Sequence, residues 1–117
     1  MYRHLKLSSD GRLARVTLER SDRRNAFSAE LMREMIAAGV EAHLATVDLA
    51  KLPASFAGRR FDRALLSALP AGIDPCGENG EFHSFVNAGP MFAQPIRITV
   101  GETVQREGFA YADLLPA

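Results

Sequence analysis

The densest group of reactive side chains lies between residues 74 and 84, which read Asp-Pro-Cys-Gly-Glu-Asn-Gly-Glu-Phe-His-Ser. Six of these side chains can ionise, bind a metal or form directed hydrogen bonds: Asp74, Cys76, Glu78, Glu81, His83 and Ser84. Between them, Gly77 and Gly80 permit positive φ and let a ligand approach the backbone closely. Such a stretch is typical of a site for a polar substrate, and equally of a polar loop that leads into an edge strand.

The spacing within this stretch predicts which side chains act together. In a strand over residues 81–86, Glu81 and His83 would share one face, and Phe82 and Ser84 would share the other. A carboxylate and an imidazole on one face suit acid–base chemistry or the binding of a polar substrate. We therefore predict that Glu81 and His83 form the catalytic centre.

Two other chemistries were weighed for the same residues. Cys76, Glu78, Glu81 and His83 are all possible zinc or iron ligands, but no CxxC or HxxxH pair is present, so no metal site is predicted. A Cys76 nucleophile with His83 as its base would lack an evident orienting group. No Lys or Arg lies within ten residues of Cys76 to lower the pKa of its thiol, so we expect a structural cysteine.

The elements that must position these residues begin with a hairpin of residues 2–8 and 12–19, because Asp10-Gly11 is a two-residue turn signal. A helix should follow, with Ser28 as its N-cap and Gly39 just beyond its C-terminus. Residues 41–47 predict a buried strand, on which His43 should be a hydrogen-bonded core histidine.

The second half of the chain predicts a short helix that is capped by Asp62 and stopped by Pro70. A polar loop leads from there to a strand at residues 82–86. A second hairpin of residues 95–100 and 103–107 should turn around Gly101. The predicted fold is α/β, with a small mixed sheet and the element order ββ-α-β-α-βββ.

Composition excludes several classes of partner. The formal net charge is zero and the pI is about 6.8, so no long-range field gathers nucleic acid or an anionic membrane surface. No run of about 18 apolar residues could span a bilayer, and the first residues lack the apolar segment of a signal peptide. The single cysteine, Cys76, excludes an internal disulfide. The cytoplasm is the expected location.

Residues 39–117 resemble the C-terminal part of the diphthine–ammonia ligase family, which belongs to the adenine-nucleotide alpha-hydrolase-like ATP pyrophosphatases. The resemblance rests on GVEAHLATVDLAKLP, SFAGRRFD, LLSALPAGIDPCGENGEFHSFV, GPMFAQPI and GFAYADLLP. The most specific element is GENGEFHS, in which the family usually has Thr where this chain has Ser84.

The resemblance implies an activity. The family activates a carboxylate with ATP and passes it to ammonia, and its eukaryotic and archaeal members act on a modified histidine of a translation elongation factor. It implies that Glu81 positions an amine and that His83 bonds to a phosphate or carboxylate oxygen. The implied substrate-binding residues around this pair are Asp74, Gly77, Glu78, Asn79, Gly80 and Ser84.

The family's ATP-binding loop is a Ser-Gly-Gly-Lys-Asp-Ser turn after an N-terminal strand, and nothing similar occurs in this sequence. The resemblance therefore implies ATP as a cofactor whose site is absent from this chain. We expect the chain to be inactive alone and to need an ATP-loop domain or another copy as its partner.

Residues 1–38 resemble instead the start of the enoyl-CoA hydratase/isomerase (crotonase) family, through DGRLARVTLERSDRRNAFSAELMREMIAA. That resemblance implies coenzyme A binding by Arg24, Asn25 and Ala26, although Glu19 and Ser21 depart from the usual pattern. Together the two resemblances predict a chimera of regions 1–38 and 39–117, incomplete relative to either parent. The alternative functions are an acyl-CoA binder and a non-catalytic module that recruits another chain through residues 95–107.

Overall fold

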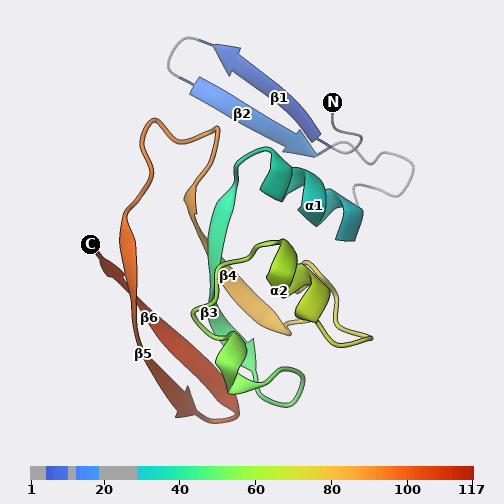
Figure 1. Cartoon of the computed structure of the whole chain (residues 1–117), viewed down its shortest axis with the longest axis vertical. Coiled ribbons are helices and arrows are strands. Elements are labelled where there is room, and N and C mark those ends of the chain that lie inside the picture. The colour runs from blue at the N-terminus through green and yellow to red at the C-terminus, as the bar shows by residue number, and fades with distance from the viewer. Residues whose placement is uncertain (1–4, 11–12, 19–28) are drawn as a thin grey trace.

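The computed structural model describes residues 5–10, 13–18 and 29–117 of the chain. Its helices and strands follow the order ββ-α-β-α-βββ, which confirms the predicted small α/β fold (Figure 1). The first two strands, β1 (Leu5–Asp10) and β2 (Leu13–Leu18), pair with each other as a separate antiparallel hairpin. The predicted turn at Gly11 lies outside the described residues.

The main sheet has four strands in the order β4-β3-β6-β5. Strand β3 (Glu41–Asp48) pairs with β4 (Phe82–Ala88) on one side and with β6 (Phe109–Pro116) on the other. Strand β5 (Ile98–Arg106) forms the outer edge, and all of these pairings are antiparallel. The two edges of the sheet are therefore β4 and β5.

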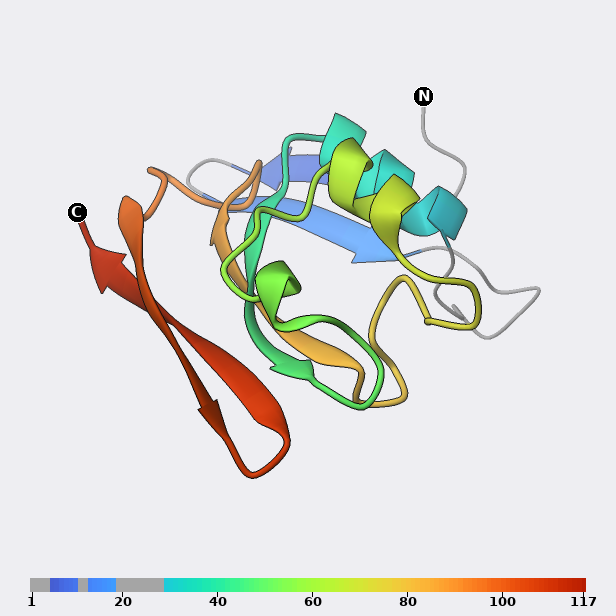
Figure 2. The ribbon, with the colours of Figure 1, turned by 60° about the horizontal axis from the view of Figure 1, so that its bottom comes forward.

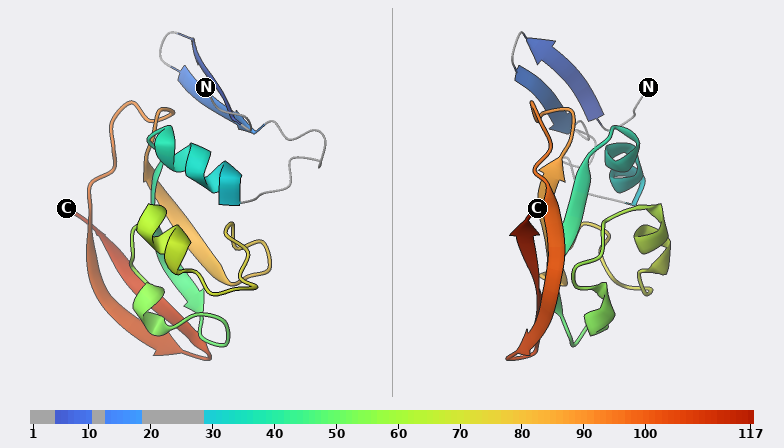
Figure 3. Two further views of the ribbon diagram at one scale, coloured as in Figure 1. Left: turned by 45° about the vertical axis from the view of Figure 1, so that its right-hand side comes forward. Right: turned by 60° about the vertical axis from the view of Figure 1, so that its left-hand side comes forward.

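Helices cover only one face of this sheet among the described elements (Figure 3). They are α1 (Ala29–Ala37), the 3-10 turn η2 (Ala54–Phe56) and α2 (Arg63–Ala68). The core lies between these helices and the sheet, and it consists of Ala42, Leu44, Val47, Leu52, Phe56, Phe61, Leu65, Phe82 and Ala110. No helix in the described part of the chain is long and apolar enough to cross a bilayer.

The three predicted helix boundaries that fall within the described residues are confirmed, and α2 ends at Ala68, just before Pro70. Gly39 has φ +92° after the last turn of α1, and its N–H donates to Ile36 O at 3.0 Å. Asp62 caps α2, because its Oδ1 accepts from Leu65 N at 2.8 Å. The predicted cap at Ser28 lies outside the described residues.

The alternation of buried and less buried side chains along β3 is interrupted at Ala45. Ala42 and Leu44 are buried under the helices, and Val47 is the next residue buried on that face. The register with β4 shifts between Leu44 and Thr46, which leaves Ala45 as an extra residue in β3. This bulge returns Val47 to the core and so keeps the helix-facing side apolar along the whole strand.

The predicted second hairpin is wrong in its turn. Strand β5 runs without interruption through Gly101, and the chain reverses at Glu107 and Gly108, which have φ values of 51° and 83°. Two successive positive φ values are typical of the tight turn that suits the twist of a hairpin. Gly101 lies at a register shift in β5, where a Cβ atom would meet Leu115 Cδ1 at 3.1 Å. Close packing, rather than a turn, thus explains this glycine.

Candidate functional site

The loop between α2 and β4 returns to the sheet beside the segment that follows β3 (Figure 2). Asp74 shapes the first half of this loop. Its Oδ1 accepts from Cys76 N at 3.0 Å and its Oδ2 from Glu78 N at 3.3 Å, while its backbone oxygen accepts from Gly77 N at 2.9 Å. The Asp side chain therefore imitates a backbone turn, as Asp does at many loop starts.

Glu81 holds the two ends of the loop together. Its side chain is buried, with only 1% of the residue exposed. Its Oε2 accepts from Asp74 N at 2.8 Å, and its Oε1 accepts from Asn79 N at 2.9 Å. Burial alone raises the pKa of Glu81, but the hydrogen bonds from backbone N–H groups outweigh it and hold the pKa below the ordinary value. The buried carboxylate is therefore ionised at neutral pH.

Gly77 is required by the geometry of this loop. It has φ +65°, and an added Cβ atom would lie 2.8 Å from the backbone oxygen of Phe82. Gly80 has φ +77° but no atom within 4 Å of the same position. The loop thus uses both glycines for their backbone conformation, and only Gly77 also for lack of a side chain.

The structure separates the two residues that were predicted to share a face. Glu81 precedes β4 and points into the loop, whereas His83 is exposed. Within β4 the alternation is as predicted, because Phe82 is buried in the core and Ser84 lines a hollow beneath α1 with Val86. His83 and Phe85 therefore face the side of the sheet that no described helix covers.

The side chains that the loop presents to solvent are those of Glu78 and Asn79, with His83 following in β4. Loss of solvation raises the pKa of Glu78, and the carboxylates of Asp74 and Glu81 raise it further. Lys51 Nζ donates to the backbone oxygen of Asn79 at 3.3 Å, so a cation lies against the same loop. Acid, base and hydrogen-bonding groups are thus all available at its surface.

The residues of this loop do not fit a nucleotide phosphate. A phosphate loop needs backbone N–H groups that point outward. Here the N–H groups of six residues already donate to acceptors within the loop: Asp74, Cys76, Gly77, Glu78, Asn79 and Gly80. The loop is therefore a rigid platform for side chains.

The remaining candidates are Cys76, the alternative metal site and the predicted coenzyme A residues. Cys76 is half-buried in the loop. Among the described residues, no group of three or more His, Cys, Asp or Glu side chains could hold a metal ion, so the alternative metal chemistry has no geometric support. The predicted coenzyme A residues, Arg24, Asn25 and Ala26, lie outside the described residues.

The sequence reasoning missed a second polar group at the other end of β4. Asn87 is buried, its Nδ2 donates to Glu41 Oε2 at 2.6 Å, and its Oδ1 lies 3.0 Å from His43 Nδ1. Arg60 completes the group with an ion pair to Glu41 at 3.1 Å. His43 is hydrogen-bonded as predicted, but the predicted core position is wrong, because His43 is half-buried and lines an open hollow. Asn87 near the end of β4 signals a polar residue there but does not identify its partners.

Fold and loop together define a small α/β domain that presents a carboxylate-anchored polar loop at the start of an edge strand. The chain matches the family model for the diphthamide synthase C-terminal domain over residues 28–114 and belongs to that family. No curated protein matches the chain at a significant level. The family match confirms the relation to diphthine–ammonia ligases.

The family match begins at residue 28 and therefore includes α1. The comparisons give no support to the crotonase resemblance or to a chimeric origin.

Proposed function

We propose that this chain forms the substrate-side domain of an ATP-dependent ligase that converts a carboxylate into an amide with ammonia. One observation supports this most directly: a chain of the diphthamide synthase C-terminal family carries a loop held by the buried carboxylate of Glu81. A separate nucleotide-binding domain would activate the carboxylate, since the described loop has no N–H groups left for phosphate.

The geometry suggests different roles for the predicted residues. Glu81 acts as a positioning residue, because both of its oxygens accept loop N–H groups and it is not accessible to a substrate. His83, Glu78 and Asn79 are exposed, so they can contact the substrate directly. Asp74, Gly77 and Gly80 shape the loop, and Ser84 faces the hollow beneath α1.

The proposed chemical contribution is proton handling and orientation. When ammonia attacks the activated carboxyl carbon, the carbon–nitrogen bond forms, the bond to the activating group breaks, and nitrogen loses a proton. The exposed imidazole of His83 can accept that proton as a general base. Glu78, with its raised pKa, is the second group that could receive it.

Reconstitution tests this proposal. The chain would be co-expressed with the ATP-loop domain of a complete relative and supplied with an elongation factor that carries the carboxylate form of its modified histidine. We expect amide formation that requires the chain, ATP and ammonium together, measured by intact-protein mass spectrometry. A folded complex of both domains that forms no amide, while the complete relative does, would contradict the proposal.

A further inference from the structure

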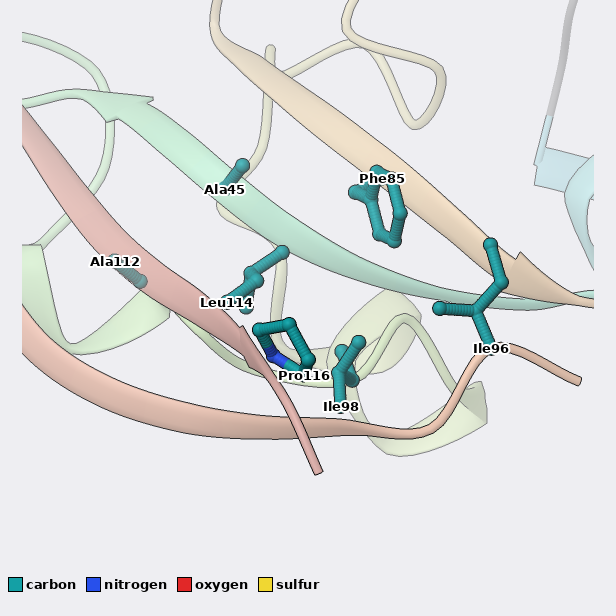
Figure 4. Close-up of a pocket in the computed structure, with 7 residues that line it drawn as sticks. All are labelled: Ala45, Phe85, Ile96, Ile98, Ala112, Leu114 and Pro116. Atoms are coloured by element: carbon teal, nitrogen blue, oxygen red, sulfur yellow. The ribbon is translucent and has the colours of Figure 1, made fainter.

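The helix-free face of the sheet carries an apolar hollow. Its volume is about 280 Å³, and it lies between β4, the start of β5 and the end of β6. The lining side chains come from these strands, from β3 and from the segment before β5 (Figure 4), and they are Ala45, Phe85, Ile96, Ile98, Ala112, Leu114 and Pro116. Ile96 remains 45% exposed and Phe85 40% exposed, so solvent reaches this apolar surface.

A polar hollow of about 460 Å³ adjoins the apolar one. Ile96 and Ile98 line both, so the two form one continuous surface that is apolar at one end and polar at the other. The polar end contains the side chains of Arg60, Arg97 and His43. A combined hollow of this size is in the range of small-molecule sites, which are typically about 300–1,000 Å³.

Hydrogen bonds of the buried Asn87 hold the side chains at the polar end in place. Asn87, only 2% exposed, donates through Nδ2 to Glu41 Oε2 and to Ile96 O. Its Oδ1 must therefore accept from His43 Nδ1, which sets the proton on that ring nitrogen. Glu41 also binds Arg60 NH2, so one guanidinium is held at the rim, with no second ion pair among the described residues.

Arg97 adds a second guanidinium to the polar end, which Glu41 and Ala117 also line. Glu41 balances Arg60. Arg97 is exposed and has no side-chain partner among the described residues. Two guanidinium groups beside an apolar strip complement a planar anion with an aliphatic body, because a guanidinium fork matches the two oxygens of a carboxylate.

We propose that this surface, defined by Phe85, Ile96, Ile98, Leu114, Arg60 and Arg97, is a second ligand site for a small aliphatic carboxylate. The carboxylate lies between Arg60 and Arg97, and the aliphatic chain lies on Ile96, Ile98 and Leu114. Asn87 and Glu41 act as positioning residues for this site. The site is distinct from the loop of residues 74–80, which lies beyond the opposite end of β4.

Titration with octanoate tests the proposal, with amide NMR shifts of the whole chain as the readout. We expect saturable shifts centred on residues 85, 96–98 and 114. Octan-1-ol and octyltrimethylammonium supply the same chain with no charge or the opposite charge, and should bind roughly tenfold more weakly because they cannot bind the guanidinium groups. Equal binding of all three, or shifts spread over the whole surface, would overturn the proposal.

Two exposed arginines near the ends of β5 give a matched pair of variants. Arg97→Gln should weaken octanoate binding by about fivefold, as expected for loss of one partly screened charge–charge contact. Arg106→Gln removes the same charge at the far end of the strand and should leave affinity unchanged. Phe85→Ala should weaken octanoate and octan-1-ol alike. Unchanged affinity of Arg97→Gln in a variant with a native-like spectrum would refute the assignment.

Discussion

At the residue scale, Glu81 is an unusual carboxylate, because it is buried and its two oxygens accept hydrogen bonds from the backbone N–H groups of Asp74 and Asn79. The sequence predicts that Glu81 shares one strand face with His83, whereas the structure places Glu81 before β4 and His83 within it. Alternation along a strand could not reveal the difference, since it says nothing about a loop that folds back over the first residue. That loop depends on hydrogen bonds from residues 74 and 79.

Glu81→Gln should destabilise the fold although it changes only one atom. The amide NH2 group would face a backbone N–H where a carboxylate oxygen now accepts, leaving a buried donor without an acceptor. We expect the free energy of unfolding to fall by about 1–3 kcal/mol, measured by urea denaturation. Glu102→Gln makes the same change on the exposed strand β5 and should alter the free energy of unfolding by less than about 0.5 kcal/mol.

The same carboxylate should make stability depend on pH. The pKa of Glu81 is lowered in the folded state, so the unfolded chain binds the proton more readily. Its stabilising contribution is therefore complete above the ordinary value of 4.5 and is lost as pH falls through the lowered folded-state pKa. The stability difference between wild type and Glu81→Gln should shrink below pH 4.5 in denaturation experiments. A difference that grows on acidification would contradict the assigned role.

At the element scale, the loop of residues 74–80 contains two glycines, Gly77 and Gly80, that the fold requires for different reasons. Gly77→Ala would introduce both a strained φ and a contact of 2.8 Å with Phe82 O. Gly80→Ala would introduce the strained φ alone. We expect Gly80→Ala to cost about 1 kcal/mol and Gly77→Ala clearly more, measured as a pair by thermal or urea unfolding. Equal losses of stability in the two variants would mean that the structure relieves the contact with Phe82 O without cost.

Local signals predicted most of the elements. Asp62 and Gly39 mark helix ends. The hydrogen bond that Asp62 accepts from Leu65 N and the positive φ of Gly39 confirm these two boundaries. The final hairpin was misplaced because Gly101 was interpreted as a turn residue, whereas Glu107-Gly108 makes the turn. A glycine used for close packing against Leu115 gives the same sequence signal as a turn glycine.

The network of Glu41, His43, Arg60 and Asn87 could not be predicted from the sequence. Its members come from two strands and from the loop before α2, and the ion pair joins residues 41 and 60. Such a cluster depends on strand order and register, which no local pattern encodes. The isolated bridge between His43 and Arg60 brings the loop residue beside β3 and completes the group.

At the scale of the whole molecule, the chain should not bind ATP tightly by itself. In the loop of residues 74–80, the N–H groups donate to acceptors within the loop. They are therefore not available to hold phosphate oxygens. We expect calorimetric titration of the chain with ATP and magnesium to show no binding at low micromolar concentration. The ATP-loop domain of a complete relative, titrated under the same conditions, provides the positive control.

We propose that the loop of residues 74–80 and the start of β4 form the substrate side of an amide-forming ligase. The most direct measurement is the steady-state rate of ATP-dependent amide formation by the reconstituted complex, with His83→Ala compared against Gln105→Ala on β5. We predict that His83→Ala lowers kcat by about 100-fold, as loss of a general base commonly does, with an unchanged denaturation midpoint. Gln105→Ala should retain the wild-type rate. An active complex in which His83→Ala keeps the wild-type kcat and KM would contradict the account.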